Sequence, residues 1–197
     1  MRAFVLTDLG FGDAGKGLLT DFLVRRTHAG VVVRYNGGAQ AGHNVVAPGG
    51  LHHTFSQFGA GTLVPGVRTF LSRHVVIHPA ALLAEGDLLA ARGVPDAFAR
   101  LRLSDQALVI TPFHQAANRI RERLRRSARH GSCGVGVGEA VSDALAHPAE
   151  RILAADLTRP GALRRKARRI QQRLHAELAP LCRLAPPDPV LAAEFSL

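Results

Sequence analysis

The sequence predicts an α/β fold with a mostly parallel, doubly wound sheet and a P-loop-like phosphate-binding loop. Short β-branched and apolar runs alternate with stretches of helical periodicity along the chain. Two of these runs end in glycine-rich segments, at residues 10–17 and 37–42. With 197 residues and 47% apolar content, the chain is long enough for one sizeable domain. In such a fold, ligands gather at the carboxyl ends of the strands.

The first half of the chain reads as alternating strands and helices. A strand is predicted at residues 3–8 and a helix at 16–26, with the first glycine-rich loop between them. A second strand at 30–35 leads into a loop of glycines and amides. After the turn at 48–50, residues 52–58 are expected to form a short strand or loop.

A third strand is predicted at residues 67–77, followed by a helix at 79–92. Pro79 suits the first turn of that helix and Gly93 suits its end. We expect four leucines to face inward from it: Leu82, Leu83, Leu88 and Leu89.

The second half of the chain continues the alternation. Residues 107–110 are predicted as a strand, 112–129 as a helix and 131–138 as a glycine-rich loop. We expect residues 1–184 to form one nucleotide-binding domain. The Pro-rich tail at 185–197 should break any helix and add little to the fold.

The first glycine-rich loop has the composition of a phosphate cradle. Gly10, Gly15 and Lys16 match the first seven positions of the P-loop pattern, whose backbone N–H groups and lysine bind phosphate. At the eighth position Gly17 replaces the Ser or Thr that would hold Mg²⁺, so Asp13 is the available carboxylate. A tight turn without a ligand is the alternative, but a turn does not require Lys16 and Asp13 among its glycines.

A second stretch, residues 31–44, is again an apolar strand that ends in glycines, followed by amide and imidazole groups. Together with residues 12–17 it resembles the N-terminal part of adenylosuccinate synthetase, in the same order and spacing. Residues 72–82 and 131–138 are similar to that family's later landmarks. The resemblance covers residues 3–180.

The resemblance implies a ligase of purine (AMP) biosynthesis that joins inosine monophosphate (IMP) to L-aspartate while cleaving GTP. It implies that Asp13 is the general base and a Mg²⁺ ligand, that His43 is the general acid, and that the Gly42 carbonyl is a second Mg²⁺ ligand. Gln40 stands where the family has an asparagine that helps to activate the purine oxygen. The nucleotide-binding residues implied in this way are Gly12, Asp13, Ala14, Gly15, Lys16, Gly17, Gln40, Ala41, Gly42, His43, Asn44, Ser132 and Cys133.

The chain also departs from the family pattern. Ala14 replaces an acidic residue and Leu18 a lysine. Cys133 falls where a threonine hydroxyl contacts phosphate, with Ser132 beside it as a substitute. Val135 replaces a loop arginine. His147 falls where an arginine crosses a dimer interface, with Arg151 as the nearest alternative.

Charge and cysteine content bound the partners and the location. The net charge of +10 comes mostly from two helical-looking stretches, 119–126 and 164–173. We interpret them as solvated helix faces, with an interface or polyanion contact as the alternative, and do not expect nucleic acid as a partner. No apolar run reaches the ~20 residues of a membrane span. Cys133 and Cys182 lack metal-site spacing, and we expect a cytoplasmic protein with reduced thiols. The resemblance implies a homodimer.

Three functions stay open at this point. The first is the GTP-dependent ligase, and the second is a catalytically weakened nucleotide-binding module. The third is a basic nucleic-acid-binding protein, whose affinity would depend on salt and survive the loss of Lys16. Members of the family are considerably longer, so the chain is either a fragment or a compact relative.

Overall fold

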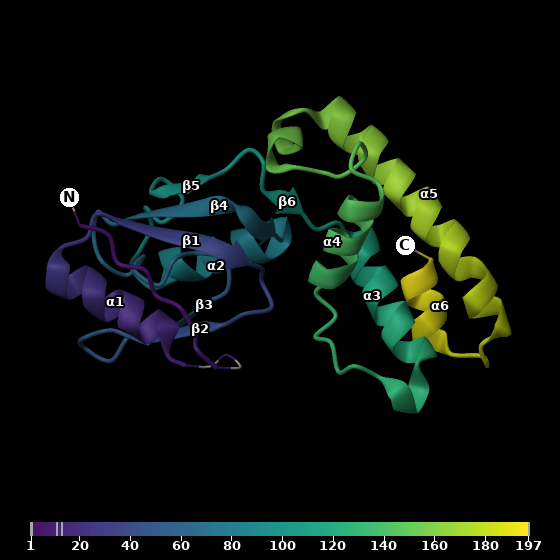
Figure 1. Ribbon diagram of the computed structural model, residues 1–197, viewed down its shortest axis with the longest axis horizontal. Coiled ribbons are helices and arrows are strands. Elements are labelled where there is room, and N and C mark those ends of the chain that lie inside the picture. The colour runs from purple at the N-terminus through teal and green to yellow at the C-terminus, as the bar shows by residue number, and fades with distance from the viewer. Residues whose placement is uncertain (1, 11, 13, 197) are drawn as a thin grey trace. The chain divides into compact units, whose positions relative to one another are not determined.

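The computed structural model describes residues 2–10, 12 and 14–196, and these form two compact units (Figure 1). The first unit contains the chain up to Val75 together with Ala80–Ser104. The second contains Val76–Pro79 and the chain from Asp105 onward.

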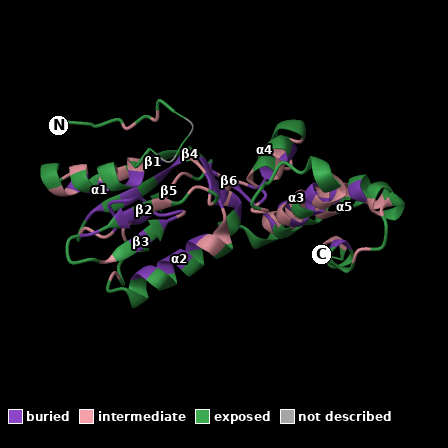
Figure 2. Ribbon diagram, turned by 90° about the horizontal axis from the view of Figure 1, so that it is seen from below, coloured by how far each residue is buried: buried purple, intermediate pink, exposed green. Residues whose placement is uncertain are grey.

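The first unit is built on a parallel sheet of β1 (Val31–Gly37), β4 (Arg68–Ile77) and β5 (Leu101–Leu103), in the order β1-β4-β5. The central strand, β4, alternates between buried and exposed residues in its first half. Residues of this alternating kind form half-buried strands because successive side chains point to opposite faces. Figure 2 shows the buried residues of this unit gathered in the strands and on one side of α2.

A hairpin and two helices complete the first unit. β2 (His43–Val46) pairs antiparallel with β3 (His52–Phe55), and glycines with positive φ make the turn between them. The helices are α1 (Lys16–Thr27) and α2 (Pro79–Ala91), the latter beginning at the unit boundary. The largest fully buried side chains here are Phe55, Phe58, Leu71, Leu89, His53, Gln57, Val45 and Val75.

The second unit is mainly helical. The last two residues of β4 pair in parallel with β6 (Leu108–Val109). Four helices follow: α3 (Pro112–Leu124), α4 (Val137–Ala146), α5 (Pro160–Leu184) and α6 (Pro189–Phe195). Short 3₁₀ turns lie at Arg126–Ala128 and Ala154–Thr158. Long α5 packs through Ile170, Leu174 and Leu178, which repeat every four residues and so share one helix face.

The predicted fold class is confirmed: the chain is α/β and its main sheet is parallel. The helices predicted at 16–26 and 79–92, and the strands at 30–35, 67–77 and 107–110, all form within a few residues of the expected bounds. The sequence did not predict β5, α4, α6 or most of α5. β2 lies where the sequence suggested only a loop.

The strand predicted at residues 3–8 was wrong. These residues are an irregular segment in Figure 1, and Val5 is 85% exposed. Hydrophobic β-branched residues favour a strand only when a neighbouring strand accepts their hydrogen bonds. Among the described residues, the sheet order ends at β1, and no pairing joins residues 3–8 to it.

The prediction that four leucines of α2 face inward was wrong for two of them. Leu82 and Leu89 are buried, but Leu83 and Leu88 are 59% and 45% exposed. The buried face of α2 instead contains Glu85 and Gly86, which have the i+3 and i+4 spacing from Leu82.

The ends of two later segments differ from expectation as well. The helix predicted at 112–129 ends at Leu124, and Arg126 has a left-handed φ of 51° that an α-helix cannot continue through. The break after α5 is confirmed, but α6 then forms with Asp188 as its N-cap. Because Leu191 is buried, the expectation that the tail adds little was wrong. No helix in the described ranges is long and apolar enough to cross a bilayer.

Candidate nucleotide-binding site

Two described glycines of the first glycine-rich loop adopt a backbone conformation that favours glycine. Gly12 and Gly15 have φ values of 105° and 72°, a region that glycine enters without steric cost. Gly15 is the N-cap of α1 and offers no side chain, so the first N–H groups of the helix have no side-chain acceptor. Such free N–H groups, at the positive end of the helix dipole, favour an anion. Asp13, the predicted base and metal ligand, lies outside the described residues.

The two sequence motifs meet at Gly17 and His43. A Cβ placed on Gly17 would lie 2.8 Å from the His43 Cβ and 3.1 Å from the His43 Cα. Only glycine therefore lets α1 approach the first residue of β2 this closely. The absence of Ser or Thr at this position, a departure from the general P-loop pattern, thus has a steric reason in this chain.

Lys16, the predicted phosphate-binding cation, contacts the Asp8 carboxylate. The hydrogen bond from Lys16 holds the pKa of Asp8 below its ordinary value, with a smaller contribution from the Gly10 N–H at 2.9 Å. A phosphate bound in the loop would compete with Asp8 for the Lys16 ammonium. The sequence analysis did not predict this role for Asp8. The only sequence signal for it is a carboxylate eight residues before the lysine of the glycine-rich loop.

His43 is half-buried and favours the neutral imidazole. Burial is the largest cause that lowers its pKa, and the positive charges of Arg34 and Lys16 lower it further, against the opposing effect of Glu85. The sequence-predicted acid therefore lies in a cationic neighbourhood. Because a bound polyphosphate would add negative charge, it would favour the protonated imidazole.

Arg34 supports the loops around His43. It is 6% exposed, and its guanidinium donates to the carbonyls of Ser56 and Gly38, the latter at 2.9 Å. Burial lowers the Arg34 pKa, an effect that Glu85 partly offsets. Arg34 lies within the segment 31–44, but the sequence alone indicated no role for it.

Glu85 supports the same region from α2. Its carboxylate accepts the N–H groups of Ser56, Gln57 and Phe58 at 3.1, 2.6 and 3.3 Å. Burial raises its pKa, but the His53 imidazole at 3.6 Å and the hydrogen bonds from residues 56–58 outweigh this and leave the pKa below its ordinary value. The sequence analysis did not predict Glu85, because it was not among the positions expected to face inward from this helix.

The amide-rich segment lies beside this scaffold. The Asn44 Oδ1 accepts the Thr54 hydroxyl at 2.5 Å, so β3 holds that side chain. A Cβ on Gly42 would lie 3.0 Å from the Thr54 Cγ2, and the glycine is exposed. Gln40 is exposed and Ala41 half-buried, both just before β2. The described residues contain no cluster of three His, Cys, Asp or Glu side chains that could hold a metal ion.

The predicted residues of the later loop belong to the second unit. The Ser132 hydroxyl and the Asn118 amide exchange hydrogen bonds at 3.1 and 3.3 Å. The N–H groups of Gly131 and Ser132 donate to the Glu122 carboxylate at 3.0 and 3.3 Å. Cys133 is exposed. The polar groups of this loop are therefore held by the protein itself.

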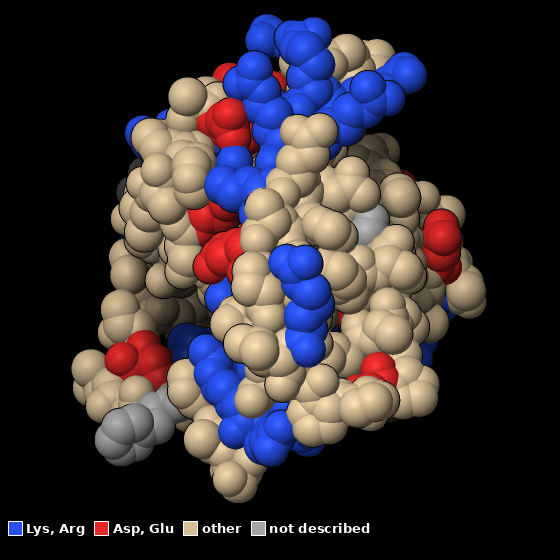
Figure 3. Space-filling model, turned by 90° about the vertical axis from the view of Figure 1, so that its right-hand side faces the viewer, with Lys and Arg blue, Asp and Glu red and all other residues tan. Residues whose placement is uncertain are grey.

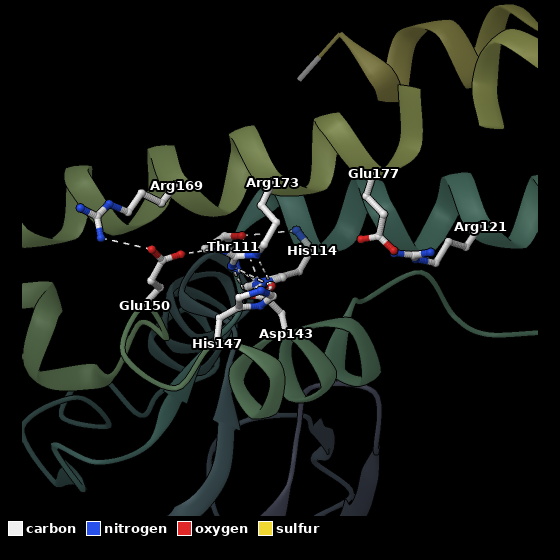
Figure 4. Close-up of polar contacts among 9 residues, drawn as sticks. All are labelled: Thr111, His114, Arg121, Asp143, His147, Glu150, Arg169, Arg173 and Glu177. Atoms are coloured by element: carbon white, nitrogen blue, oxygen red, sulfur yellow. Dashed lines mark hydrogen bonds and ion pairs between the residues drawn. The ribbon is translucent and has the colours of Figure 1, made fainter. Parts of the chain in front are cut away.

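His147, at the position of the family's interface arginine, lies at the edge of a buried ion-pair cluster (Figure 4). Its Nδ1 is 3.5 Å from Asp143, which is 9% exposed. Arg173 donates to Asp143 from both Nε and Nη2, at 2.8 to 3.0 Å. This cluster joins α4 to α5. The pairing of Asp143 with Arg173 gave no sequence signal, because the two residues lie 30 positions apart. Arg151, the alternative, is exposed.

His114 completes the cluster from α3, where its contacts indicate a structural role. Its Nδ1 accepts the Thr111 N–H at 3.1 Å, which leaves the proton on Nε2, 3.4 Å from Asp143. Burial lowers the His114 pKa, although Asp143 acts in the opposite direction.

Comparisons with known proteins agree on one family. The family model described as adenylosuccinate synthetase matches residues 5–189. Adenylosuccinate synthetase of Mycobacterium leprae is 39% identical over 166 residues, which are 84% of this chain and 37% of the relative. The Myxococcus xanthus protein is 39% identical over 193 residues, which are 96% of this chain and 42% of that one. The chain thus spans about two fifths of the length of these relatives.

Among solved structures, fully ligated adenylosuccinate synthetase from Plasmodium falciparum shares the fold. Its TM-score is 0.73 at 22% identity, covering 94% of this chain and 41% of that one.

Proposed function

Because the chain belongs to the adenylosuccinate synthetase family, we propose that it carries the phosphate-handling part of a GTP-dependent ligase that joins IMP to L-aspartate in purine biosynthesis. The observation that carries this proposal is the close approach of Gly17 to His43. It brings the helix N-terminus that would bind phosphates beside the imidazole that would serve the reacting purine. Phosphoryl transfer depends on this kind of positioning more than on covalent chemistry.

Each residue has a role in this proposal. The N–H groups at Gly15 to Gly17 and the Lys16 ammonium bind the triphosphate. Asp13 takes the N1 proton of the purine. His43 donates to the developing negative charge, a task that bound phosphates favour because they promote its protonated form. Gln40 and Asn44 lie at the same end of β2 and orient the purine nucleotide.

The donor set suits Mg²⁺. Asp13 would supply a carboxylate and Gly42 a backbone carbonyl, the hard oxygen ligands that Mg²⁺ takes alongside phosphate oxygens. Mg²⁺ would neutralise charge on the transferred phosphoryl group. Gly42 is exposed, which leaves its carbonyl side accessible to a ligand.

A weakened nucleotide-binding module is the second candidate. The observation that favours it is the loop at Ser132, where the N–H groups of Gly131 and Ser132 already donate to the Glu122 carboxylate. In this case the chain would bind nucleotide and hydrolyse it slowly, without forming adenylosuccinate.

Assembly and location follow from the same proposal. We propose a homodimer, as the family resemblance implies, and sedimentation that gives a monomer at tens of micromolar with nucleotide would count against it. A cytoplasmic location fits the two free thiols, Cys133 and Cys182, because oxidising compartments favour disulfides.

Calorimetry with GTP and Mg²⁺ tests the binding part. Lys16→Ala should weaken binding by tenfold or more, because a charge-assisted contact to phosphate is lost. Arg26→Ala is the matched control, since it removes an exposed cation from the same helix. Equal GTP affinity in the parent and Lys16→Ala would refute the cradle.

Chromatographic assay of adenylosuccinate from IMP, aspartate and GTP tests the chemistry. We expect the 197-residue chain to make little or none and to show at most slow Mg²⁺-dependent GTP hydrolysis. That hydrolysis should fall in Asp13→Asn and His43→Ala. Undiminished activity in Asp13→Asn would contradict the assigned roles, and robust synthesis by the parent would rule out the weakened module.

A further inference from the structure

The N-terminal half of α5 presents four exposed arginines, which we call the arginine stripe: Arg164, Arg165, Arg168 and Arg169. At 100° per residue they fall on the side of the helix opposite the buried apolar residues that hold α5 in its unit. Figure 3 shows Lys and Arg side chains gathered at the top of this face, where α5 begins in Figure 1.

The acidic residues near the arginine stripe are already paired. Glu150 contacts Arg169 and Arg173, while Asp156 contacts Lys166 at 2.7 Å. Within the described part of the chain, no ion pair involves the other three members of the stripe. Three guanidinium groups therefore face solvent without an acidic partner.

This arrangement costs stability, and three of its four members form no ion pair among the described residues that would offset the cost. Arg164 and Arg168, like Arg165 and Arg169, are like charges four residues apart, a spacing that destabilises a helix. The first turn of α5 contains no acidic residue, and Arg159 occupies the N-cap. The positive end of a helix dipole favours negative charge in the first turn. Because α5 has no acidic residue there and has Arg159 at its N-cap, an external anion would stabilise this end of the helix.

We propose that the arginine stripe is a docking surface for a nucleic-acid strand, bound through its phosphates. Guanidinium groups match phosphate oxygens with two parallel N–H donors. The stripe extends about 7.5 Å along the helix axis, so a single phosphate would reach one or two of its members. A strand, with a charge about every 3.4 Å, passes all four.

The contact should not depend on base sequence. Residues 160–173, which include the stripe, contain no aromatic side chain on which bases could stack. The stripe would therefore contact only the phosphate backbone. The net charge of +10 would add long-range attraction. From the sequence we expected these arginines only to form a solvated helix face. The structure adds that the nearby acidic residues are paired elsewhere, which leaves three of the arginines without acidic partners.

Fluorescence anisotropy with a labelled oligouridylate of about 20 nucleotides tests the proposal. The triple variant Arg164→Gln, Arg165→Gln, Arg168→Gln should bind at least tenfold more weakly in about 50 mM salt. Its slope of log affinity against log salt should be shallower by about 2, because three phosphate contacts are lost. The control is Arg26→Gln, Arg68→Gln, Arg183→Gln, which removes the same charge from exposed positions elsewhere and should stay within about threefold of the parent.

Further outcomes decide against the proposal. Equal losses in the two triple variants would show that only net charge matters. Competition by polyglutamate as strong as that by unlabelled oligouridylate would indicate an acidic protein partner instead. Lys16→Ala separates this surface from the nucleotide site, since it should bind oligouridylate like the parent. Loss of that binding in Lys16→Ala with none in the stripe variant would place the contact at the glycine-rich loop.

Discussion

In the first unit the buried charges of Arg34 and Glu85 bond to main-chain groups of loops, whereas in the second unit Asp143 bonds to the side chain of Arg173 on another helix. The first arrangement fixes backbone beside the candidate site. The second holds helices α4 and α5 together, and the described residues suggest no ligand contact for it. The difference predicts that losing a charge in the first unit should disturb binding, and losing one in the second should mainly disturb stability.

The largest effect is expected from Asp143→Ala. It removes one of the two acidic partners of Arg173, which has 20% side-chain exposure, and leaves Glu150 as the other. Breaking a buried pair in this way costs about 3 kcal/mol. Urea denaturation measures the loss, and GTP affinity of the folded fraction should not change. A loss under about 1 kcal/mol would show that the cluster does not hold α4 and α5 together.

Glu85→Gln should have a smaller effect on stability and a direct one on the site. The amide keeps the shape of the side chain but loses an acceptor for the N–H groups of residues 56–58, at a cost of about 1–3 kcal/mol. Hydrogen exchange of these amides should accelerate, and GTP should bind more weakly. Glu177→Gln, at an exposed ion pair, is the control and should change neither.

Acid should weaken the second unit through His114. Its pKa is lowered in the folded state, so the unfolded chain takes up a proton more readily as pH falls through the ordinary histidine value near 6.5. Stability is then lost at no more than about 1.4 kcal/mol per pH unit from this group. Urea midpoints between pH 7.5 and 5.5 should fall less steeply in His114→Gln. Identical slopes would show that His114 is not the group responsible.

His43 should give the smallest and most local signal. Its pKa, measured by NMR titration, should lie below the ordinary value and rise when GTP and Mg²⁺ bind, because the phosphates offset the charges of Arg34 and Lys16. Exposed His28, at the other end of α1, provides the internal control. If both histidines respond alike, the nucleotide does not bind beside His43.

Sequence reasoning reached the fold class and located the two glycine-rich segments of the candidate site, because local patterns encode both. The glycines before α1 and those after β1 were visible as motifs. Their contact through Gly17 and His43 was not, because it depends on how a helix meets a distant strand.

The errors have the same origin. A Cβ on Gly86 would lie 2.0 Å from the Phe98 ring, so the buried face of α2 is shaped by a loop twelve residues away. Residues 3–8 have the composition of a strand, but strand formation depends on a partner that composition cannot supply. Arg34 and Glu85 escaped notice because their partners are backbone groups, which look alike in every sequence.

The tight fit at Gly17 also constrains how this loop can evolve. Mutation to serine would restore the hydroxyl that an ordinary P-loop uses for its metal, yet any Cβ there collides with His43. A lineage would have to give up the imidazole, or reposition the hairpin that carries it, before that hydroxyl could be gained. A loop with a metal-binding hydroxyl at this position is therefore separated from the present loop by a steric barrier that a single substitution cannot cross.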